Sequence, residues 1–260
     1  MMTFKNNIID TSNGNYTNII AGPCSAENRD QLFNTAEALK NIGICKIRAG
    51  LWKPRSRFGT FEGVGCIGLP WLKEIQSGLG MKVMTEVALP SHVEMALKYD
   101  IDMLWIGART TVNPFMVTEL AGALKGTKIP VYIKNPMCPD IELWAGCIER
   151  MMHADIKNLF LIHRGFCLLD NTPYRNSPLW ELSDKIREEF PNIPIYCDPS
   201  HMAGNKELIH GICLKAIEKK YDGIFIESHI SPKDALSDAR QQITPAELKF
   251  LLENLENNNL

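Results

Sequence analysis

Short, almost fully apolar runs recur along the chain, and longer segments between them carry apolar residues every three or four positions. Continuous apolar runs are typical of parallel strands buried on both faces, and the second pattern is that of an amphipathic helix. The pattern predicts strands at residues 18–24, 45–49, 82–86, 102–107, 130–134, 158–163, 193–198 and 223–227. It predicts helices at residues 25–41, 71–79, 90–99, 113–125, 141–154, 179–190 and 206–219, and a last helix from 244 with a polar tail at 253–260.

Eight strand–helix units in about 240 residues are the number expected for a (β/α)₈ TIM barrel, an α/β fold. An open, doubly wound sheet is the alternative, but the first predicted strand is not followed by a GxGxxG motif. No linker rich in Pro, Gly or Ser divides the chain, and it shows no short internal repeat. The sequence therefore predicts one domain over residues 1–260, with the barrel core at about 15–250.

The composition narrows the class of protein. A net charge of −2 argues against non-specific nucleic-acid binding, which needs a basic face. No apolar run reaches the roughly 18–20 residues of a membrane helix, and the first residues lack the apolar region of a signal peptide. The eight cysteines include no CxxC pair, so we expect reduced thiols and a cytoplasmic protein.

Chemically active side chains stand where the predicted strands end. In (β/α)₈ barrels the active site lies at the carboxyl ends of the strands, so these residues are expected to converge. They are Cys24, Arg48 with Lys53, Glu86, Arg109, Lys134, Arg164, Asp198 with His201, and Glu227.

Cations form the larger part of this set. They are Arg48, Lys53, Arg55, Arg109, Lys134 and Arg164. So many positive charges at one mouth would repel one another unless ligand anions neutralise them. Arginine binds phosphate or carboxylate with two hydrogen bonds, and the hydroxyl of Ser56 could complete such a shell. The pattern predicts more than one bound phosphate or carboxylate, although an ordinary salt bridge is the alternative for any single cation.

A second set has the chemistry of a metal site. Cys24, His201, Glu227 and Asp238 offer a thiolate, an imidazole and two carboxylates, which suit Mn, Fe, Co or Zn. The ligands follow the first, seventh and eighth predicted strands, which become neighbours when a barrel closes. Taken alone, Cys24 could be a small buried apolar residue, and His201 could be a general base or a helix cap.

Together these motifs resemble the 3-deoxy-D-arabino-heptulosonate 7-phosphate (DAHP) synthases, and most closely the short β-type branch of the type I enzymes. The resemblance covers about residues 15–250 and implies a (β/α)₈ barrel. It implies a transferase that condenses phosphoenolpyruvate with erythrose 4-phosphate and water, the first step of the shikimate pathway to chorismate and the aromatic amino acids. The motifs are Gly22-Pro-Cys-Ser25, Arg48 with Lys53-Pro-Arg-Ser56, Ile106-Gly-Ala-Arg-Thr110, Lys134, Arg164-Gly165, Asp198-Pro-Ser-His201 and Ile226-Glu-Ser-His229.

The resemblance also implies roles for single residues. A divalent metal, Mn²⁺ first with Co²⁺, Fe²⁺ or Zn²⁺ as alternatives, would be held by Cys24, His201, Glu227 and Asp238. Phosphoenolpyruvate would be held by Arg48, Lys53, Arg109, Lys134 and Arg164, with Glu86 beside them. Arg55 and Ser56 would take the phosphate of the aldose. Lys53, Cys24 and His201 are the expected catalytic residues, and Lys53 is the candidate proton donor to the new alkoxide, with a metal-bound water as the rival.

Two alternatives differ in substrate or in class. The 3-deoxy-D-manno-octulosonate 8-phosphate synthases resemble the chain in their barrel but use arabinose 5-phosphate, and their loop usually reads Lys-Ala-Asn-Arg-Ser-Ser. The shorter Lys53-Pro-Arg-Ser56 favours the four-carbon sugar. A non-catalytic phosphosugar-binding barrel is the second alternative, and loss of a metal ligand or of Lys53 would be its signature.

Some positions depart from the family pattern. His163 stands where a Glu commonly precedes the Arg-Gly pair, and we expect a structural role for it. Asn135-Pro136 follows Lys134 where β-type members often have Arg-Gly, so both departures concern the phosphoenolpyruvate side. The resemblance further implies a homo-oligomer, a dimer or tetramer, and the chain length leads us to expect no regulatory domain and no fused chorismate mutase.

Overall fold

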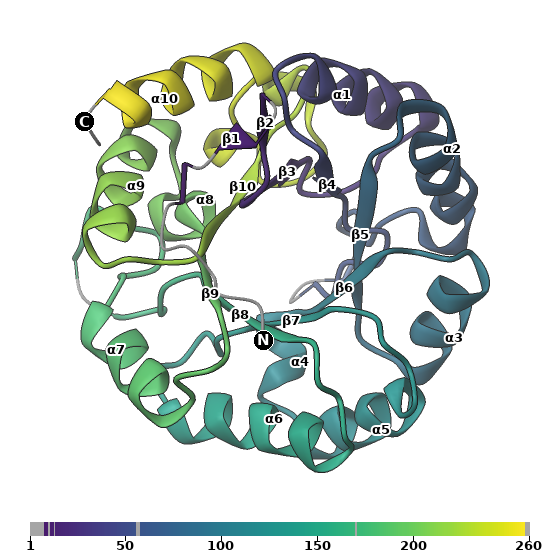
Figure 1. Cartoon of the computed structure of the whole chain (residues 1–260), viewed down its shortest axis with the longest axis vertical. Coiled ribbons are helices and arrows are strands. Elements are labelled where there is room, and N and C mark those ends of the chain that lie inside the picture. Colours follow the sequence, from purple (N-terminus) through teal and green to yellow (C-terminus); the bar gives the residue numbers. More distant parts are fainter. Residues whose placement is uncertain (1–7, 10, 13, 56–57, 170, 258–260) are drawn as a thin grey trace.

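The computed structural model describes residues 8–9, 11–12, 14–55, 58–169 and 171–257, and in it parallel strands close into a barrel in the order β10-β3-β4-β5-β6-β7-β8-β9 (Figure 1). These strands are β3 (Ile19–Gly22), β4 (Lys46–Arg48), β5 (Lys82–Val87), β6 (Met103–Ile106), β7 (Val131–Lys134), β8 (Leu159–His163), β9 (Ile195–Cys197) and β10 (Gly223–Glu227). The barrel closes where β10 pairs with β3, with Glu227 opposite Gly22. The predicted (β/α)₈ barrel is confirmed.

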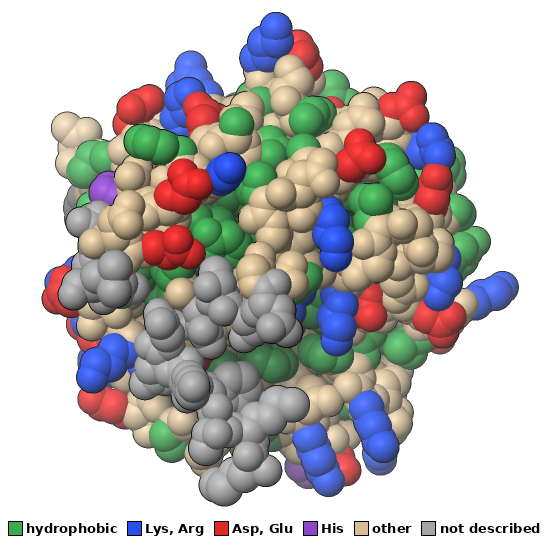
Figure 2. Space-filling view, turned by 45° about the horizontal axis from the view of Figure 1, so that its top comes forward, with side chains coloured by type: hydrophobic (Ala, Val, Ile, Leu, Met, Phe, Trp, Pro, Cys, Tyr) green, Lys and Arg blue, Asp and Glu red, His purple; other side chains and the backbone are tan. Residues whose placement is uncertain are grey.

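Helices surround the barrel on its outside (Figure 1). They are α1 (Arg29–Asn41), α2 (Leu69–Leu79), α3 (Pro90–Lys98), α5 (Pro114–Leu124), α6 (Ile141–His153), α7 (Trp180–Glu189), α9 (Ile209–Glu218) and α10 (Pro245–Asn257). Within the described ranges, none of the helices has the length and apolar character needed to cross a bilayer. Basic and acidic side chains are interspersed over the face shown in Figure 2, as the small net charge would suggest.

Two predicted helix boundaries differ most from the structure. The first helix begins at Arg29 and not at residue 25, because the Asn28 side chain accepts a hydrogen bond from the backbone N–H of Gln31 and caps the helix there. The last helix continues to Asn257, so residues 253–257 are helical rather than part of a polar tail. Its Leu255 is fully buried, which gives this last turn a packing reason to remain helical.

Several short elements were not predicted, because they are too short to show a periodic pattern. Strands β1 (Thr11–Ser12) and β2 (Asn15–Tyr16) form a small antiparallel pair before the barrel. The single-turn helices α4 (Ala108–Thr111) and α8 (Pro199–Ala203) follow β6 and β9. These two helices carry Arg109 and His201, so they place site residues. The remaining unpredicted elements are the 3₁₀ turns η1 (Gly65–Gly68), η3 (Pro232–Asp234) and η4 (Ala239–Gln241). A further 3₁₀ turn, η2 (Lys206–Leu208), forms the start of the helix that was predicted from residue 206.

Apolar side chains are buried on both faces of the sheet. A large cluster packs the strands against the surrounding helices. A smaller cluster is formed by Ile20, Met84, Met103, Trp105, Tyr132, Ile162, Tyr196 and Phe225. These residues come from neighbouring strands and alternate with the helix-facing residues, so they fill the inside of the barrel. Burial on both faces explains why the strands read as continuous apolar runs.

We expect Ile20→Ala to lower the free energy of unfolding by about 2–5 kcal/mol, because it removes three carbons from the filled barrel interior and leaves a cavity. Ile67→Ala is the matched control, since Ile67 is 65% exposed whereas Ile20 is fully buried. The control should change the unfolding free energy by no more than about 0.5 kcal/mol. Denaturant unfolding followed by circular dichroism measures both, and equal losses in the two variants would contradict the described interior.

Candidate active site and metal centre

A pocket opens at the carboxyl ends of the barrel strands. Strand ends and the loops after them supply its walls, which carry most of the residues predicted from the sequence. They include Arg48, Lys53, Arg55, Glu86, Arg109, Lys134, Arg164, Arg175, Asn176, His201 and Asp238. Ser56, predicted to take a phosphate, lies outside the described residues. The structure therefore brings all six predicted cations to one pocket.

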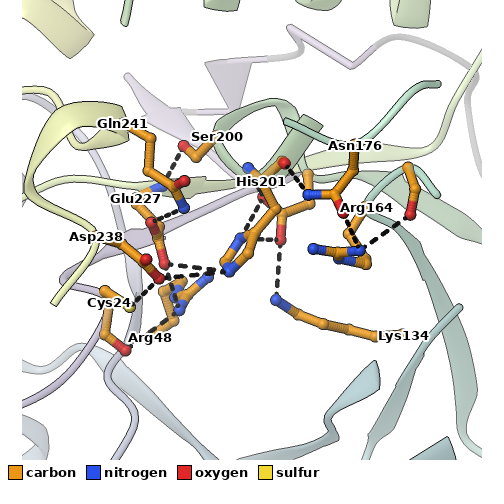
Figure 3. A network of polar contacts seen from close by, with 12 residues as sticks. Cys24, Arg48, Lys134, Arg164, Asn176, Ser200, His201, Glu227, Asp238 and Gln241 are labelled. Atoms are coloured by element: carbon orange, nitrogen blue, oxygen red, sulfur yellow. Dashed lines mark hydrogen bonds and ion pairs between the residues drawn. The ribbon is translucent and has the colours of Figure 1, made fainter. Parts of the chain in front are cut away.

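A thiol and two carboxylates lie together at the side of the pocket near β3 and β10. The candidate ligand atoms of Cys24, Glu227 and Asp238 all lie within 4.8 Å of one another. Nε2 of His201 lies 3.7 Å from Oε1 of Glu227 and 4.0 Å from Oδ2 of Asp238. Figure 3 shows the imidazole of His201 between these carboxylates and the side chains of Lys134 and Arg164. The four side chains predicted as metal ligands therefore form one cluster.

Asp198 orients the imidazole of His201 from the side that faces away from the other predicted ligands. Nδ1 of His201 lies 2.9 Å from Oδ2 of Asp198, and the other carboxylate oxygen of Asp198 accepts the backbone N–H of His201 at 3.1 Å. Burial would raise the pKa of Asp198, but His201 and Lys134 hold it well below its usual value, so the carboxylate is ionised. Nε2 is left facing Glu227 and Asp238. A carboxylate behind a histidine is the usual arrangement at metal sites, so the donor set and its support both fit a divalent transition metal.

The thiol of Cys24 is fully buried at this site. Burial and the neighbouring Glu227 raise its pKa to about 12, although the nearby Lys53 opposes the rise. Nζ of Lys53 lies 2.9 Å from Sγ of Cys24, and Oδ2 of Asp238 lies 3.1 Å from the same sulfur. A bound divalent cation would favour the thiolate over the thiol, because metal binding displaces the proton of a ligating cysteine.

Arg48 lies between the cluster of predicted metal ligands and the rest of the pocket. Its Nη2 donates to Oε1 of Glu227 at 3.2 Å, and its guanidinium carbon lies 4.3 Å from the ring centre of Phe225 and 5.0 Å from that of Trp105. Among the described residues, its buried Nε and Nη1 find no hydrogen-bond partner. Buried donors without a partner are costly, so the two free nitrogens fit a site for a bound anion.

Lys134 and Arg164 line the pocket on the other side of His201. Nζ of Lys134 lies 2.9 Å from Oδ2 of Asp198, and burial lowers the pKa of this lysine against the effect of that carboxylate. Nη1 of Arg164 donates to the side-chain oxygen of Asn176 at 2.8 Å. Burial lowers the pKa of Arg164 to about 10, so it remains charged at neutral pH. Two cations thus face the pocket with only partial neutralisation.

Asn135, which departs from the family pattern, holds the backbone of Arg164. Its side-chain oxygen accepts the backbone N–H of Arg164 at 2.7 Å, and its amide nitrogen donates to the carbonyl oxygen of Gly165 at 2.9 Å. Asn135 is fully buried, so these bonds are shielded from water. The residue therefore fixes the turn at the end of β8 that presents Arg164.

His163 is buried among aromatic rings behind this wall. Its Nδ1 lies 2.7 Å from the hydroxyl of Tyr221, and Trp180 and Phe166 pack against its ring. Burial lowers the pKa of His163 to about 3, so the imidazole is neutral at physiological pH. Its side chain contacts the packed core, which fits the structural role expected for it.

Sequence reasoning missed several residues that support the site. Nε1 of Trp105 donates to Oε2 of Glu86 at 3.0 Å, and a side chain at Gly107 would collide with the same carboxylate. The amide of Asn176 contacts Arg164 with its oxygen and donates to the backbone oxygen of His201 at 2.6 Å. Asn176 lies in a loop far beyond the end of β8, where a search of strand ends could not find it. Trp105 lies in an apolar strand, and the sequence pattern does not distinguish it from the other apolar residues there.

Comparison with known proteins identifies relatives for the whole barrel. Residues 2–259 match the model of the DAHP synthetase I family. A Phospho-2-dehydro-3-deoxyheptonate aldolase of Thermotoga maritima is 33% identical over 248 residues, which cover 95% of this chain and 71% of the relative. A 2-dehydro-3-deoxyphosphooctonate aldolase of Wolinella succinogenes is 25% identical, covering 91% of this chain and 97% of that protein.

Solved structures show the same likeness. The crystal structure of the DAHP synthase of Thermotoga maritima superposes with a TM-score of 0.82 at 30% identity, covering 92% of this chain and 68% of that one. A truncated form of 3-deoxy-D-arabino-heptulosonate 7-phosphate synthase from the same organism gives a TM-score of 0.79 at 28% identity, covering 92% of this chain and 85% of that one.

We expect three of the eight cysteines to react readily with Ellman's reagent in the folded protein. Cys66, Cys138 and Cys167 are exposed, whereas Cys24, Cys147, Cys197 and Cys213 are buried and Cys45 is intermediate. Buried thiols react slowly because reagent is excluded and burial raises their pKa. All eight should react after denaturation, and peptide mapping identifies the labelled sites. Labelling of Cys24 as fast as Cys66 in native protein would contradict its described burial.

Proposed function

The chain belongs to the DAHP synthetase I family and is a DAHP synthase, a transferase, and we propose that it condenses phosphoenolpyruvate with erythrose 4-phosphate and water to give DAHP and phosphate. This is the first step of the shikimate pathway. The observation that carries the proposal is one pocket that joins buried, partly unpaired cations to a Cys–His–Glu–Asp cluster. Two phosphorylated substrates account for the cations, and an aldehyde that must be polarised accounts for the metal ligands.

Phosphoenolpyruvate is proposed to lie on the cationic wall. The free Nε and Nη1 of Arg48 and the charged ends of Lys134 and Arg164 suit its carboxylate and phosphate, and Arg109 and Lys53 line the same pocket. Because Arg48, Lys134 and Arg164 are buried, their hydrogen bonds to an anion would be strong and little screened by salt. Glu86, held by Trp105, borders this wall and would limit where the anion can sit.

Cys24, His201, Glu227 and Asp238 are proposed to hold a divalent metal, Mn²⁺ first, with Co²⁺, Fe²⁺ or Zn²⁺ as alternatives. The bound metal would supply a Lewis acid for the aldehyde oxygen. Asp198 would keep Nε2 of His201 aimed at the site through its contact with Nδ1. Arg48 contacts Glu227, so the phosphoenolpyruvate side and the metal side would lie next to each other.

Lys53 is proposed to act between the two halves of the pocket. Its Nζ lies beside Sγ of Cys24, within reach of a ligand at the metal site. C3 of phosphoenolpyruvate forms the new carbon–carbon bond to the aldehyde carbon, and Lys53 donates a proton to the aldehyde oxygen. Water then adds at C2, and one of its protons restores the one that Lys53 gave up. The C2–O bond to the phosphate breaks, the second proton leaves with the phosphate, and C2 becomes a carbonyl. The cations of the wall stabilise the charge that moves onto the phosphate.

Arg55, with Ser56, is proposed to take the phosphate of the aldose. Arg55 is held where the chain leaves the barrel, because Lys53 N–H donates to the carbonyl of Glu62 at 2.8 Å and Nε of Arg55 donates to the carbonyl of Phe61 at 2.8 Å. Octulosonate relatives are less similar than the heptulonate relative, at 24–28% against 33% identity, so arabinose 5-phosphate is not favoured.

The catalytic unit is proposed to be this single barrel, which works as a homo-oligomer, a dimer or a tetramer. The predicted site residues within the described ranges come from the strand ends of one barrel and from the loops and short helices that follow them, which supports one domain as the functional unit.

We expect phosphate release from phosphoenolpyruvate only when erythrose 4-phosphate and a divalent metal such as Mn²⁺ are both present. EDTA should abolish the release, and excess Mn²⁺ should restore it, because the metal polarises the aldehyde. A phosphate assay with erythrose 4-phosphate and arabinose 5-phosphate in parallel reactions makes the measurement. Faster turnover with the pentose would show that the aldose assignment is wrong, and release with neither sugar would favour a binding protein.

We expect Arg55→Ala to raise KM for erythrose 4-phosphate by about 10–100-fold, because one charged hydrogen-bonding partner of its phosphate is worth about 1.5–3 kcal/mol. KM for phosphoenolpyruvate serves as the internal control and should change by less than about twofold, since Arg55 is not on the proposed phosphoenolpyruvate wall. Steady-state kinetics with each substrate varied in turn measures both constants. An equal rise in both would place Arg55 in a general structural role.

A further inference from the structure

Gln241, a residue without an assigned role, contacts Glu227 in the proposed metal site. It ends the 3₁₀ turn η4 after β10, and its side chain is buried. Its Nε2 donates to Oε2 of Glu227 at 2.7 Å (Figure 3). Its Oε1 accepts a hydrogen bond from Nη1 of Arg175 at 2.6 Å. The same Nη1 lies 2.9 Å from Oδ1 of Asp238. Arg175 and Gln241 thus reach both carboxylates of the cluster.

The chemistry of the partners fixes the orientation of the Gln241 amide. An arginine can only donate hydrogen bonds, and an ionised carboxylate can only accept them. The amide oxygen must therefore face Arg175, and the amide nitrogen must face Glu227. Gln241 can satisfy both at once, whereas an apolar side chain of similar size can satisfy neither.

The two carboxylates divide their oxygens in the same way. One oxygen of each accepts a supporting hydrogen bond: Oε2 of Glu227 from Gln241, and Oδ1 of Asp238 from Arg175. The other two face the remaining proposed ligands, because Oε1 of Glu227 lies 3.7 Å from Nε2 of His201 and Oδ2 of Asp238 lies 3.1 Å from Sγ of Cys24. One oxygen of each carboxylate is thus kept toward the centre of the cluster.

Asp238 needs such support more than a strand residue does. It lies in the loop after β10, in the left-handed backbone region with φ of 53°. Arg175 lies in the loop after β8, and its side chain reaches Asp238. The stem of Arg175 packs against Gly204 at the end of α8, where a side chain on the glycine would collide with it. Arg175 thus ties the loop of Asp238 to the helix that carries His201.

We propose that Gln241 and Arg175 are positioning residues that hold Glu227 and Asp238 in the geometry needed to bind the metal, and so set the affinity of the site for it. The inference rests on the proposed metal site. Partners behind metal ligands typically change metal affinity by about 10–100-fold when they are removed. Neither residue needs to touch the metal or the substrates.

The test uses variants that conserve charge, so that the electrostatic attraction of the site for a cation stays constant. Gln241→Leu keeps the size of the side chain and removes both hydrogen bonds. Arg175→Lys keeps the charge but can reproduce only part of the hydrogen bonding. Gln31→Leu is the control for the first, because Gln31 is a buried glutamine of α1 outside the cluster. Arg29→Lys is the control for the second, because Arg29 pairs with Glu74 on the surface.

Co²⁺ titration of the metal-free full chain gives the dissociation constant, and the near-ultraviolet charge-transfer band reports the bond between Co²⁺ and the Cys24 thiolate. We expect Gln241→Leu to weaken Co²⁺ binding about 10-fold or more and to change the band. Arg175→Lys should lie between this variant and the wild type, and both controls should match the wild type. Far-ultraviolet circular dichroism checks that each variant is folded.

A wild-type constant in folded Gln241→Leu would overturn the positioning role while leaving the metal site intact. If Gln241→Leu does not fold, Arg175→Lys decides, and wild-type affinity there overturns the inference. A wild-type chain that binds no Co²⁺ would overturn the metal site itself, and the inference with it. Equal weakening in Gln31→Leu would also overturn the inference, since any buried glutamine would then have the same effect.

Discussion

The buried ion pair between Arg48 and Glu227 is the interaction on which the whole pocket depends. Both side chains are almost completely inaccessible to water, and Nη2 lies 3.2 Å from Oε1. A buried charge without a partner is strongly destabilising, whereas a paired and hydrogen-bonded one is tolerated. Arg48 belongs to the cationic wall and Glu227 to the proposed metal cluster. Neither half of the pocket could keep its charges buried without the other.

A second buried ion pair of this kind lies on the other side of His201. Lys134 pairs with Asp198, which also orients the imidazole through Nδ1. The cations proposed to hold phosphoenolpyruvate are therefore balanced by carboxylates that belong to, or orient, the proposed metal ligands. When a cation binds the acidic side, the cations lose part of their compensation and their attraction for an anion rises. The ion pairs Arg48–Glu227 and Lys134–Asp198 thus provide a physical reason for the proposed metal and phosphoenolpyruvate to favour each other's binding.

The sequence predicted the residues whose position follows from topology alone. Each strand of a parallel barrel ends at the same rim, so Arg48, Lys134 and Glu227 had to converge once the strand pattern was recognised. Arg175, Asn176 and Gln241 could not be found in this way, because they lie in loops whose path depends on specific side-chain contacts. The helix starting at Arg29 rather than residue 25 has the same origin, since one side-chain cap at Asn28 decides where it begins.

Departures from a family pattern can be understood from the contacts that replace the usual ones. Asn135 holds the backbone of Arg164 with two buried hydrogen bonds, and Asn176 holds its guanidinium. His163 is neutral and faces Tyr221, so it adds no charge to the wall. Arg164 is consequently fixed by neutral groups alone, and its positive charge remains available to an anion in the pocket. A carboxylate in place of His163 would have competed with that anion, so this departure is consistent with the proposed phosphoenolpyruvate site rather than evidence against it.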